Sequence, residues 1–264
     1  EGAPIRRSGH GKPFMDAGGR WQMLYLCTRN AEGQTLLGRE TGLDPIEWTA
    51  EGWPMVNRLR GPSCLKPMPG VSHPVTEEID WLTPRGHGMT FARWQGEDVT
   101  LQAGAGLDSL EPVSLVARRQ TEAALRQEAE VDASALAEGG RAGLAGYYDE
   151  RSWYLFGLER QAEGFRLGAW ERAGECLREA ASLAWPGAAA QLRVIGRGMV
   201  RTLQYRDGHA WRTLATLHAD YLTDEGVRGG KRYTGATVGL AATGGGSAAF
   251  RHRTESMTED ETDE

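Results

Sequence analysis

Three side chains in this sequence have types and surroundings suited to binding a ligand. His10 lies between two glycines, so no neighbouring side chain obstructs a ligand, although the pattern also fits a histidine in a turn. Arg39 carries a planar guanidinium suited to bidentate contact with paired hydroxyls or a carboxylate, unless it forms a structural ion pair with Glu40 or another acid. Tyr233 follows a glycine-rich stretch and could stack on a ring-shaped ligand or simply begin a strand.

Residues 36–57 must position Arg39. Two short apolar runs, a turn marked by proline and three glycines predict a strand, a tight connection, a short second strand and a turn at residues 51–52. Because strand residues alternate between faces, either Arg39 or Glu40 must face inward or line a cavity. Residues 20–28 predict a further strand that is largely apolar, and therefore buried, on both faces.

Proline and glycine divide the chain into parts. Residues 61–74 hold four prolines and two glycines with little hydrophobic pattern, which predicts a linker between a first part at 1–60 and a second at 75–253. Residues 254–264 contain six acidic residues and no basic ones, which predicts a disordered tail.

The second part shows short, evenly spaced strand-like segments separated by turn signals, which predicts an all-β sandwich. The expected strands are 89–93, 99–101, 144–148, 153–159, 164–171, 192–195, 199–205, 211–217, 237–242 and 248–253. Residues 118–132 are rich in helix-forming types, but apolar and polar residues alternate there, so we expect a strand.

Charge and cysteine content exclude several classes of protein. The net charge of −6 comes from the acidic end, since the remainder has 30 acidic and 30 basic residues. Nucleic acid and membranes are therefore not expected partners. The three cysteines are widely spaced without a metal-binding pattern, which indicates reduced thiols and a cytoplasmic location. We expect Trp94, Trp153, Trp170 and Trp211 to be core residues rather than sugar-stacking platforms.

Several motifs carry a resemblance to a known family. Segments 8–11 (SGHG), 19–26 (GRWQMLYL), 37–41 (LGRET) and 52–57 (GWPMVN) resemble the end of the catalytic domain of family 43 glycoside hydrolases. Segments 115–120, 142–148 and 233–240, with Thr243 and Gly244, resemble the C-terminal sandwich of its β-xylosidases. The resemblance implies an all-β chain with part of a five-bladed propeller, followed by a two-sheet antiparallel, concanavalin-like jelly-roll sandwich.

The resemblance also gives the three side chains roles. It places His10 at the floor of the active-site funnel, near a metal ion, often calcium, and Arg39 in the substrate pocket. It places Tyr233 on a loop of the sandwich that narrows the pocket mouth. Lys12 stands where the family usually has an acidic residue, so the resemblance does not define the local charge of the pocket.

We expect no catalytic residue in this chain. Inverting hydrolysis of a glycoside requires an acid and a base on opposite sides of the scissile bond. In the family these carboxylates, and a third that tunes the acid, lie in earlier blades. The acids in the first part are Glu1, Asp16, Glu32, Glu40, Asp44, Glu47 and Glu51. None has a matching place, and Glu1 lies too close to the SGHG segment to be the family's acid.

The resemblance implies the C-terminal part of an enzyme that removes xylose or arabinose from plant-wall oligosaccharides. Its expected partners are xylo- or arabino-oligosaccharides and a second copy of the chain. Two alternatives stay open: a stand-alone, lectin-like carbohydrate-binding sandwich, and a structural module that caps or oligomerises an enzyme. The LGRET and SGHG segments favour the enzyme, because a free lectin has no use for part of a propeller.

Overall fold

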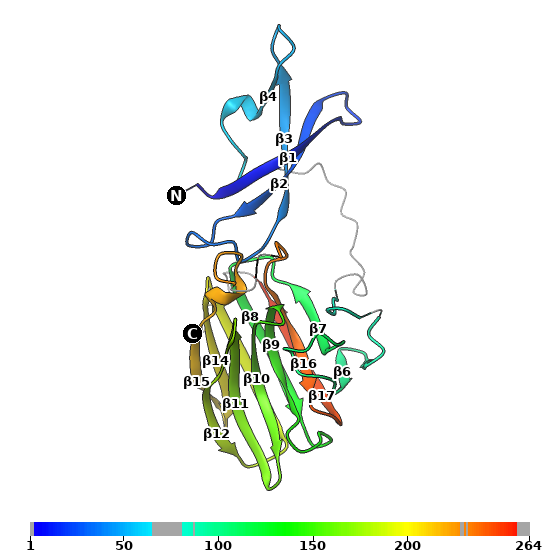
Figure 1. The fold of residues 1–264 in the computed structure, drawn as a ribbon, viewed down its shortest axis with the longest axis vertical. Helices are drawn as coiled ribbons and strands as arrows, with labels where there is room; N and C mark the ends of the chain where they lie inside the picture. Colours follow the sequence, from blue (N-terminus) through cyan, green and yellow to red (C-terminus); the bar gives the residue numbers. More distant parts are fainter. Residues whose placement is uncertain (1–2, 65–80, 87, 228–229, 231, 258–264) are drawn as a thin grey trace.

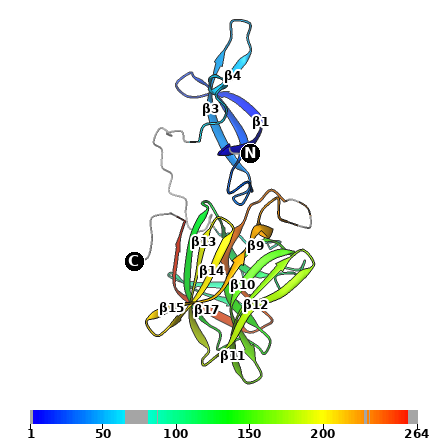
Figure 2. The same ribbon diagram turned by 90° about the vertical axis from the view of Figure 1, so that its left-hand side faces the viewer.

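The computed structural model describes residues 3–64, 81–86, 88–227, 230 and 232–257, and these form three antiparallel β-sheets. Two sheets pack face to face as a sandwich, and a smaller sheet stands on one end of it (Figures 1 and 2). The prediction of an all-β chain with a two-sheet antiparallel sandwich is confirmed. No helix in these residues has the length and apolar character to cross a membrane.

The small sheet has four strands in sequence order. They are β1 (Ile5–Met15), β2 (Trp21–Arg29), β3 (Glu40–Trp48) and β4 (Pro54–Val56), followed by the 3-10 turn η1 (Asn57–Leu59). Strand β1 pairs with β2 through two register shifts, one on each side of Gly9. The expected turn at residues 51–52 is present. The tight connection predicted before it is not, because β3 runs unbroken from Glu40 to Trp48, and the short strand β4 follows the turn instead of preceding it.

One face of the sandwich is a six-stranded sheet in the order β12-β11-β10-β9-β16-β7. In chain order its strands are β7 (Ser114–Arg119), β9 (Arg141–Asp149), β10 (Ser152–Gln161), β11 (Gly164–Ala173), β12 (Cys176–Trp185) and β16 (Thr237–Thr243).

The facing sheet has seven strands in the order β15-β14-β13-β8-β17-β6-β5. They are β5 (Ala92–Gln95), β6 (Asp98–Gln102), β8 (Ala124–Asp132), β13 (Ala189–Arg197), β14 (Val200–Asp207), β15 (Ala210–His218) and β17 (Ser247–Ser256). The 3-10 turn η2 (Asp220–Leu222) leads from β15 toward the loop before β16.

Some details differ from the sequence predictions. Residues 118–132 form the end of β7 and all of β8, with a turn between them, rather than one strand. Strand β17 extends to Ser256, so the start of the expected tail belongs to the sheet, and residues 258–264 lie outside the described residues. Most of the expected linker, from residue 65, also lies outside them.

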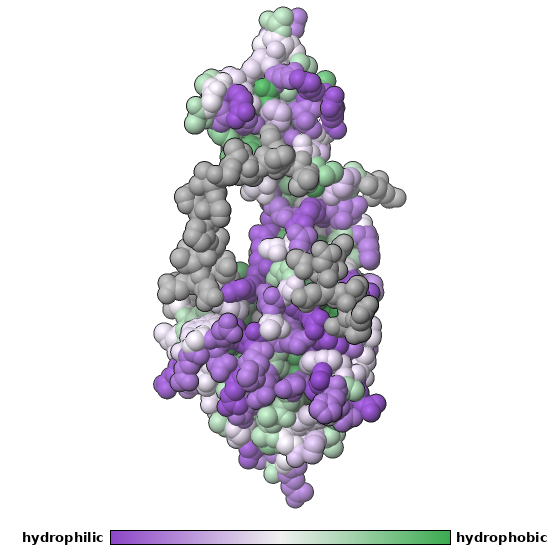
Figure 3. Space-filling view, turned by 180° about the vertical axis from the view of Figure 1, so that it is seen from behind, coloured by the Kyte–Doolittle hydropathy of each residue, from purple (hydrophilic) through white to green (hydrophobic). Residues whose placement is uncertain are grey.

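The small sheet exposes much apolar surface. The prediction that residues 20–28 are buried on both faces is wrong in this chain, because Trp21 and Leu24 are exposed. The other large exposed apolar side chains of the small sheet and its turns are Phe14, Met15, Trp48, Trp53 and Leu59. Figure 3, by contrast, shows hydrophilic residues over much of the back of the sandwich. Exposed apolar area of this extent is typical of a surface that another part of a protein covers.

The segment just before β3 belongs to the core of the sandwich. Leu36 and Leu37 are buried in the same hydrophobic cluster as Phe156, Leu158 and Tyr221. The small sheet is therefore attached to the sandwich by buried side chains as well as by the chain between them. This attachment fixes the position of Arg39, two residues further on.

Candidate functional site

The candidate site forms where residues 35–39 lie along the loop that ends at Ala236. Ala236 donates its backbone N–H to the carbonyl of Leu36 at 2.8 Å, and Arg39 donates to the carbonyl of Tyr233 at 3.4 Å. The guanidinium of Arg119 on β7 donates to the carbonyls of Leu37, at 2.7 Å, and Arg39. Two segments far apart in sequence are thus joined through their backbones.

Two glycines make this close approach possible. Gly38 and Gly235 both have left-handed backbone angles, with φ of 70° and 75°. A Cβ on Gly38 would lie 2.4 Å from the nitrogen of Gly235, and a Cβ on Gly235 would lie 2.4 Å from the carbonyl carbon of Leu37. A side chain at either position would therefore push the two segments apart.

Arg39 and Tyr233 meet at this contact. The Cζ atom of Arg39 lies 3.9 Å from the centre of the Tyr233 ring, which is a cation–π contact. Glu40 does not pair with Arg39, because its carboxylate pairs with Arg29 at 2.9 Å. The structure thus excludes the ion pair with Glu40 that was considered for Arg39. Tyr233 lies in the loop before β16, and not at the start of that strand. Both side chains are exposed to solvent.

A buried hydrogen-bond chain holds the backbone of Tyr233. The Tyr148 hydroxyl accepts the N–H groups of Arg232 and Tyr233 at 2.7 and 3.1 Å, and donates to the carboxylate of Asp224 at 2.7 Å. Burial and the hydrogen bond to Asp224 raise the pKa of Tyr148 to about 12. The hydroxyl therefore keeps its proton at neutral pH and can donate to Asp224 while it accepts from the loop.

Glu225 ties the same loop to the small sheet. Its carboxylate accepts the N–H of Thr35 at 2.7 Å and the Thr35 hydroxyl at 3.0 Å, and pairs with Arg7 of β1 at 2.5 Å. Arg7 also reaches the carboxylate of Asp224 at 3.4 Å. Burial raises the pKa of Glu225, but the Thr35 hydrogen bonds and the Arg7 charge outweigh it and leave the pKa below its ordinary value.

This lowered pKa predicts a pH-dependent stability. The contribution of Glu225 should be complete above about pH 4.5, its ordinary value, and be lost as the pH falls through its lower folded-state pKa. Glu225→Gln should cost about 1–2 kcal/mol at pH 7, through the loss of charge-assisted contacts, and clearly less near pH 3. Urea unfolding at both pH values measures the difference.

Glu47→Gln is the matched control, since Glu47 pairs with Arg58 at an exposed site. It should change the free energy of unfolding by less than about 0.5 kcal/mol. An equal loss for Glu225→Gln at both pH values would contradict the role given to the Glu225 charge.

His10 lies in strand β1 and not in a simple turn. It has a left-handed φ of 52° beside the register shifts around Gly9, and its side chain is exposed. The register aligns Gly9, Leu26 and Thr41 across β1, β2 and β3. The strand carrying His10 is therefore two strand spacings, roughly 10 Å, from the one that follows Arg39. Arg39 and Tyr233 are brought together, and His10 is not in contact with them.

A cavity of about 310 Å³ lies beside β1, lined by residues that include Gly9, Gly11 and Asp44. Asp44 is buried and accepts hydrogen bonds from the Tyr25 hydroxyl at 2.6 Å and from the backbone N–H of Ser63 at 3.0 Å. The Ser63 hydroxyl donates to it as well. These bonds explain the buried carboxylate as a structural group that holds residues 61–63 against the sheet.

Other acids of the small sheet also serve as structural partners. Glu40 pairs with Arg29, Glu47 pairs with Arg58 at 2.6 Å, and Asp16 accepts hydrogen bonds that close the turn before β2. Hydrogen bonds, foremost from the backbone of Arg20, lower the pKa of Asp16 to about 2. Glu1 lies outside the described residues.

A metal site is not formed by the described residues. Among them, no three or more histidine, cysteine, aspartate or glutamate side chains converge in a way that could hold an ion. Calcium takes six to eight oxygen ligands, which His10 does not supply. His10 and its described neighbours therefore do not fit a calcium ion held by this chain alone.

Sequence reasoning missed the residues that support the site. Arg7, Thr35, Tyr148, Asp224 and Glu225 were not singled out, although they connect β1, β9 and the loop around Tyr233. Their only signal is local: Asp224 and Glu225 precede a glycine in a turn. Nothing in the sequence indicates that Arg7 meets them.

Comparisons with known proteins agree with this architecture. A protein of Escherichia coli (strain K12), named provisionally as a beta-xylosidase, is 29% identical over 294 aligned positions, covering 90% of this chain and 51% of that protein. The "Xylosidase/arabinosidase 43B" of Humicola insolens is 25% identical over 91% of this chain and 50% of its own length. The chain spans about half the length of these curated relatives.

A solved structure is similar throughout. The crystal structure of the GH43 protein BlXynB from Bacillus licheniformis superposes with a TM-score of 0.87 at 27% identity, covering 97% of this chain and 55% of that one. Residues 1–54 match the model of glycosyl hydrolases family 43. Residues 76–252, more than half of the chain, match the beta xylosidase C-terminal concanavalin A-like domain. The chain therefore belongs to glycoside hydrolase family 43 and carries the C-terminal sandwich of its β-xylosidases.

Proposed function

We propose that this chain is the C-terminal part of a glycoside hydrolase that removes xylose or arabinose from plant-wall oligosaccharides by inverting hydrolysis. The observation that carries the proposal is the contact of Arg39 with Tyr233, 3.9 Å from Cζ to ring centre, which joins the small sheet to the sandwich. The names of the relatives, xylosidase and arabinosidase, support the choice of sugars.

Arg39 has donors available for a substrate. Stacking on Tyr233 uses the face of the guanidinium, and no described residue accepts a hydrogen bond from its side chain. Its in-plane N–H groups can then donate to paired sugar hydroxyls or orient a carboxylate. Tyr233 limits the positions that the guanidinium can take, and its own exposed ring edge narrows the space beside it.

The chemical step requires an acid and a base on opposite sides of the anomeric carbon, with a water between base and sugar. We assign neither to this chain, because its described acids near the site have structural partners. Arg39 and Tyr233 act by positioning the sugar. His10 is proposed to line the same pocket in a longer protein, and a calcium ion near it would need oxygen ligands from residues beyond this chain.

The proposal is tested by release of nitrophenol from aryl β-xyloside and α-arabinofuranoside. The 264-residue chain should release none above the rate of buffer, while a version extended upstream with the rest of the catalytic domain should turn over. Turnover by the 264-residue chain that survives repurification, and that a change of one of its own acids abolishes, would contradict the assignment. A homo-oligomer and a cytoplasmic location remain predictions from the sequence alone.

Substitutions of Arg39 and Tyr233 should lower kcat/KM of the longer enzyme by different amounts. Arg39→Ala should lower kcat/KM by about 10- to 100-fold, the loss expected for hydrogen bonds from a charged donor. Tyr233→Ala should lower it by about 3- to 30-fold through loss of the cation–π support, while Tyr233→Phe, which keeps the ring, should change it little.

Arg58→Ala is the matched control, because Arg58 is an exposed arginine of the turn η1 next to the small sheet and pairs with Glu47. Its kcat/KM should match that of the unsubstituted enzyme. If Arg39→Ala unfolds the protein yet retains full activity per folded molecule, Arg39 has only a structural role.

A further inference from the structure

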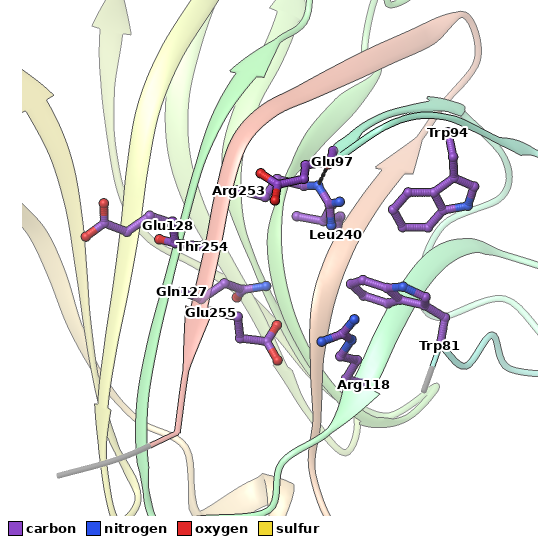
Figure 4. Close-up of a pocket in the computed structure, with 10 residues that line it drawn as sticks. All are labelled: Trp81, Trp94, Glu97, Arg118, Gln127, Glu128, Leu240, Arg253, Thr254 and Glu255. Atoms are coloured by element: carbon purple, nitrogen blue, oxygen red, sulfur yellow. Dashed lines mark hydrogen bonds between the residues drawn. The ribbon is translucent and has the colours of Figure 1, made fainter. Parts of the chain in front are cut away.

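A second cavity lies within the sandwich and shares no residue with the Arg39–Tyr233 contact. It has a volume of about 160 Å³ and lies between β7, β8, β16, β17 and the segments that carry Trp81 and Trp94 (Figure 4). That volume is several times the roughly 30 Å³ that one water occupies in the liquid. The cavity has room for one small ligand, such as a single sugar unit.

Two arginines face this cavity. The guanidinium of Arg118 on β7 lies 4.1 Å from the centre of the Trp81 ring, and that of Arg253 on β17 lies 4.9 Å from the centre of the Trp94 ring. Neither forms an ion pair with any described residue. Burial and then the nearby charge of Arg118 lower the pKa of Arg253, while the carboxylates of Asp98, Glu97 and Glu255 act in the opposite direction.

The contacts with tryptophan leave N–H groups of both guanidinium groups available to a ligand. Each uses a face against tryptophan, so its in-plane donors remain oriented for a planar carboxylate. Arg253 donates only its Nε–H, to the carbonyl of Glu97, and the Nε of Arg118 is buried without a hydrogen-bond partner among the described residues. Figure 4 shows the two groups extending into the same space, with the Glu255 carboxylate opposite Arg118.

The remaining wall offers hydrogen-bond acceptors. Glu97 and Glu255 line the cavity, and burial holds the pKa of Glu255 above its ordinary value despite the nearby charges of Arg118 and Arg253. Glu128 lines it too, but its carboxylate pairs with Arg126 at 2.8 Å and points away from the two arginines (Figure 4). Gln127, only 3% exposed, donates to the carbonyl of Gly239, while its Oε1 has no partner among the described residues. Buried polar groups without partners are uncommon, and here they mark a wall with unused hydrogen-bonding capacity.

The backbone of β17 bends where it supplies the cavity. Its pairing with β8 shifts register between Arg251 and Thr254, and His252 has a left-handed φ of 49°. A bulge of this kind changes the direction of the side chains in and beyond it, and here Arg253 lies in the bulge and Glu255 follows it. The prediction that Trp94 is a core residue is wrong, since it is 38% exposed at this cavity, while Trp153 and Trp170 are buried as expected.

We propose that this cavity binds a uronic acid, a sugar ring that carries a carboxylate. The two arginines would bind the carboxylate, and Glu97 and Glu255 would accept hydrogen bonds from the ring hydroxyls. The tryptophan pair, with ring centres 5.2 Å apart, and Leu240 provide apolar surface for the C–H groups of the ring. Glu97 and Glu255 disfavour a multiply charged inorganic anion, and two arginines without an ion pair among the described residues disfavour a neutral sugar.

Calorimetric titration of the 264-residue chain with sodium D-glucuronate tests the proposal. Saturable binding to one site is expected, at least tenfold tighter than binding of D-glucose, of the methyl ester of glucuronic acid, or of acetate and sulfate at equal ionic strength. Absence of glucuronate binding overturns the proposal. Equal binding of the ester indicates a neutral-sugar site, and equal binding of acetate or sulfate a simple anion site, and either result overturns it too.

Substitutions of the two arginines test whether glucuronate binds in this cavity. Arg118→Gln and Arg253→Gln should each weaken glucuronate binding at least tenfold, with unchanged circular dichroism, and Arg118→Lys should retain part of the affinity by keeping the charge. Arg206→Gln is the matched control, because Arg206 also stacks on a tryptophan, Trp211, but lies outside the cavity. An equal loss for Arg206→Gln, or no loss for either cavity variant, contradicts the site. These readouts do not depend on glycoside hydrolysis, so they are independent of the proposed enzymatic function.

Discussion

Replacing Leu36 with alanine is expected to lower the free energy of unfolding of this chain by about 2–5 kcal/mol, the usual cost of truncating a buried leucine. Leu36 has 0% of its surface exposed and packs in the main hydrophobic cluster of the sandwich. It does so although it precedes β3 of the small sheet. Its loss would leave a cavity in this cluster, which surrounding side chains could fill only in part.

Leu59→Ala is the control from the same part of the chain. Leu59 is 76% exposed, so its truncation should change the free energy of unfolding by less than about 0.5 kcal/mol. Urea unfolding followed by tryptophan fluorescence compares the two variants. Small and equal losses would show that residues 35–39 are not packed into the sandwich in solution.

This packing changes the expected division of the chain. A boundary at residues 61–74 separates the segments by sequence, and the two family matches, 1–54 and 76–252, fall on either side of it. Yet Leu36 and Leu37 belong to the core of the second segment. A cut in the linker would therefore leave the first segment attached to the sandwich through buried contacts.

Alternation of apolar and polar residues accounts for only some of the strands that could be predicted. In β8, burial alternates residue by residue from Ala124 to Asp132, which is why its pattern outweighed the helix-forming composition. Strand β12 was missed because it is the edge strand of its sheet and largely exposed, so its sequence carries little of this alternation. Strands β9 and β10 are buried at nearly every position, and they were predicted from short apolar segments between turn signals rather than from alternation.

The candidate site could be predicted only in part, for a related reason. Arg39 and Tyr233 were found from their side-chain chemistry and the family motifs, but their contact depends on a backbone pairing between residues 36 and 236. Such a pairing has no local sequence signal. Tyr148 ends one of the family motifs and Asp224 lies in a turn, but only the fold shows that they hold the backbone of Tyr233.

The arginines of the second cavity illustrate the same limit. Arg118 and Arg253 alternate with other residues in unremarkable strands, and each sits beside residues that do form ion pairs or hydrogen bonds. Their missing partners become visible only when Trp81 and Trp94 are seen stacked on them. Charge counts along a sequence cannot distinguish a paired arginine from an unpaired one.

Gly38→Ala is expected to disrupt the candidate site more than any change to an exposed side chain. Two effects add: alanine disfavours the left-handed backbone at φ 70°, and its Cβ would lie within 2.4–2.6 Å of backbone atoms of Thr234 and Gly235. Together they should cost roughly 2–4 kcal/mol. Because the Gly235 loop carries Tyr233, its displacement should also separate Tyr233 from Arg39.

Gly52→Ala separates these two effects. Gly52 also has a left-handed φ, 85°, but a Cβ there would meet nothing within 4 Å. It should therefore show only the backbone cost, about 1 kcal/mol, and both variants share the same entropy change in the unfolded chain. In the longer enzyme, kcat/KM should fall at least tenfold for Gly38→Ala and stay near that of the unsubstituted enzyme for Gly52→Ala. Similar stability and activity for the two variants would mean that the close approach of residues 38 and 235 does not hold Arg39 against Tyr233.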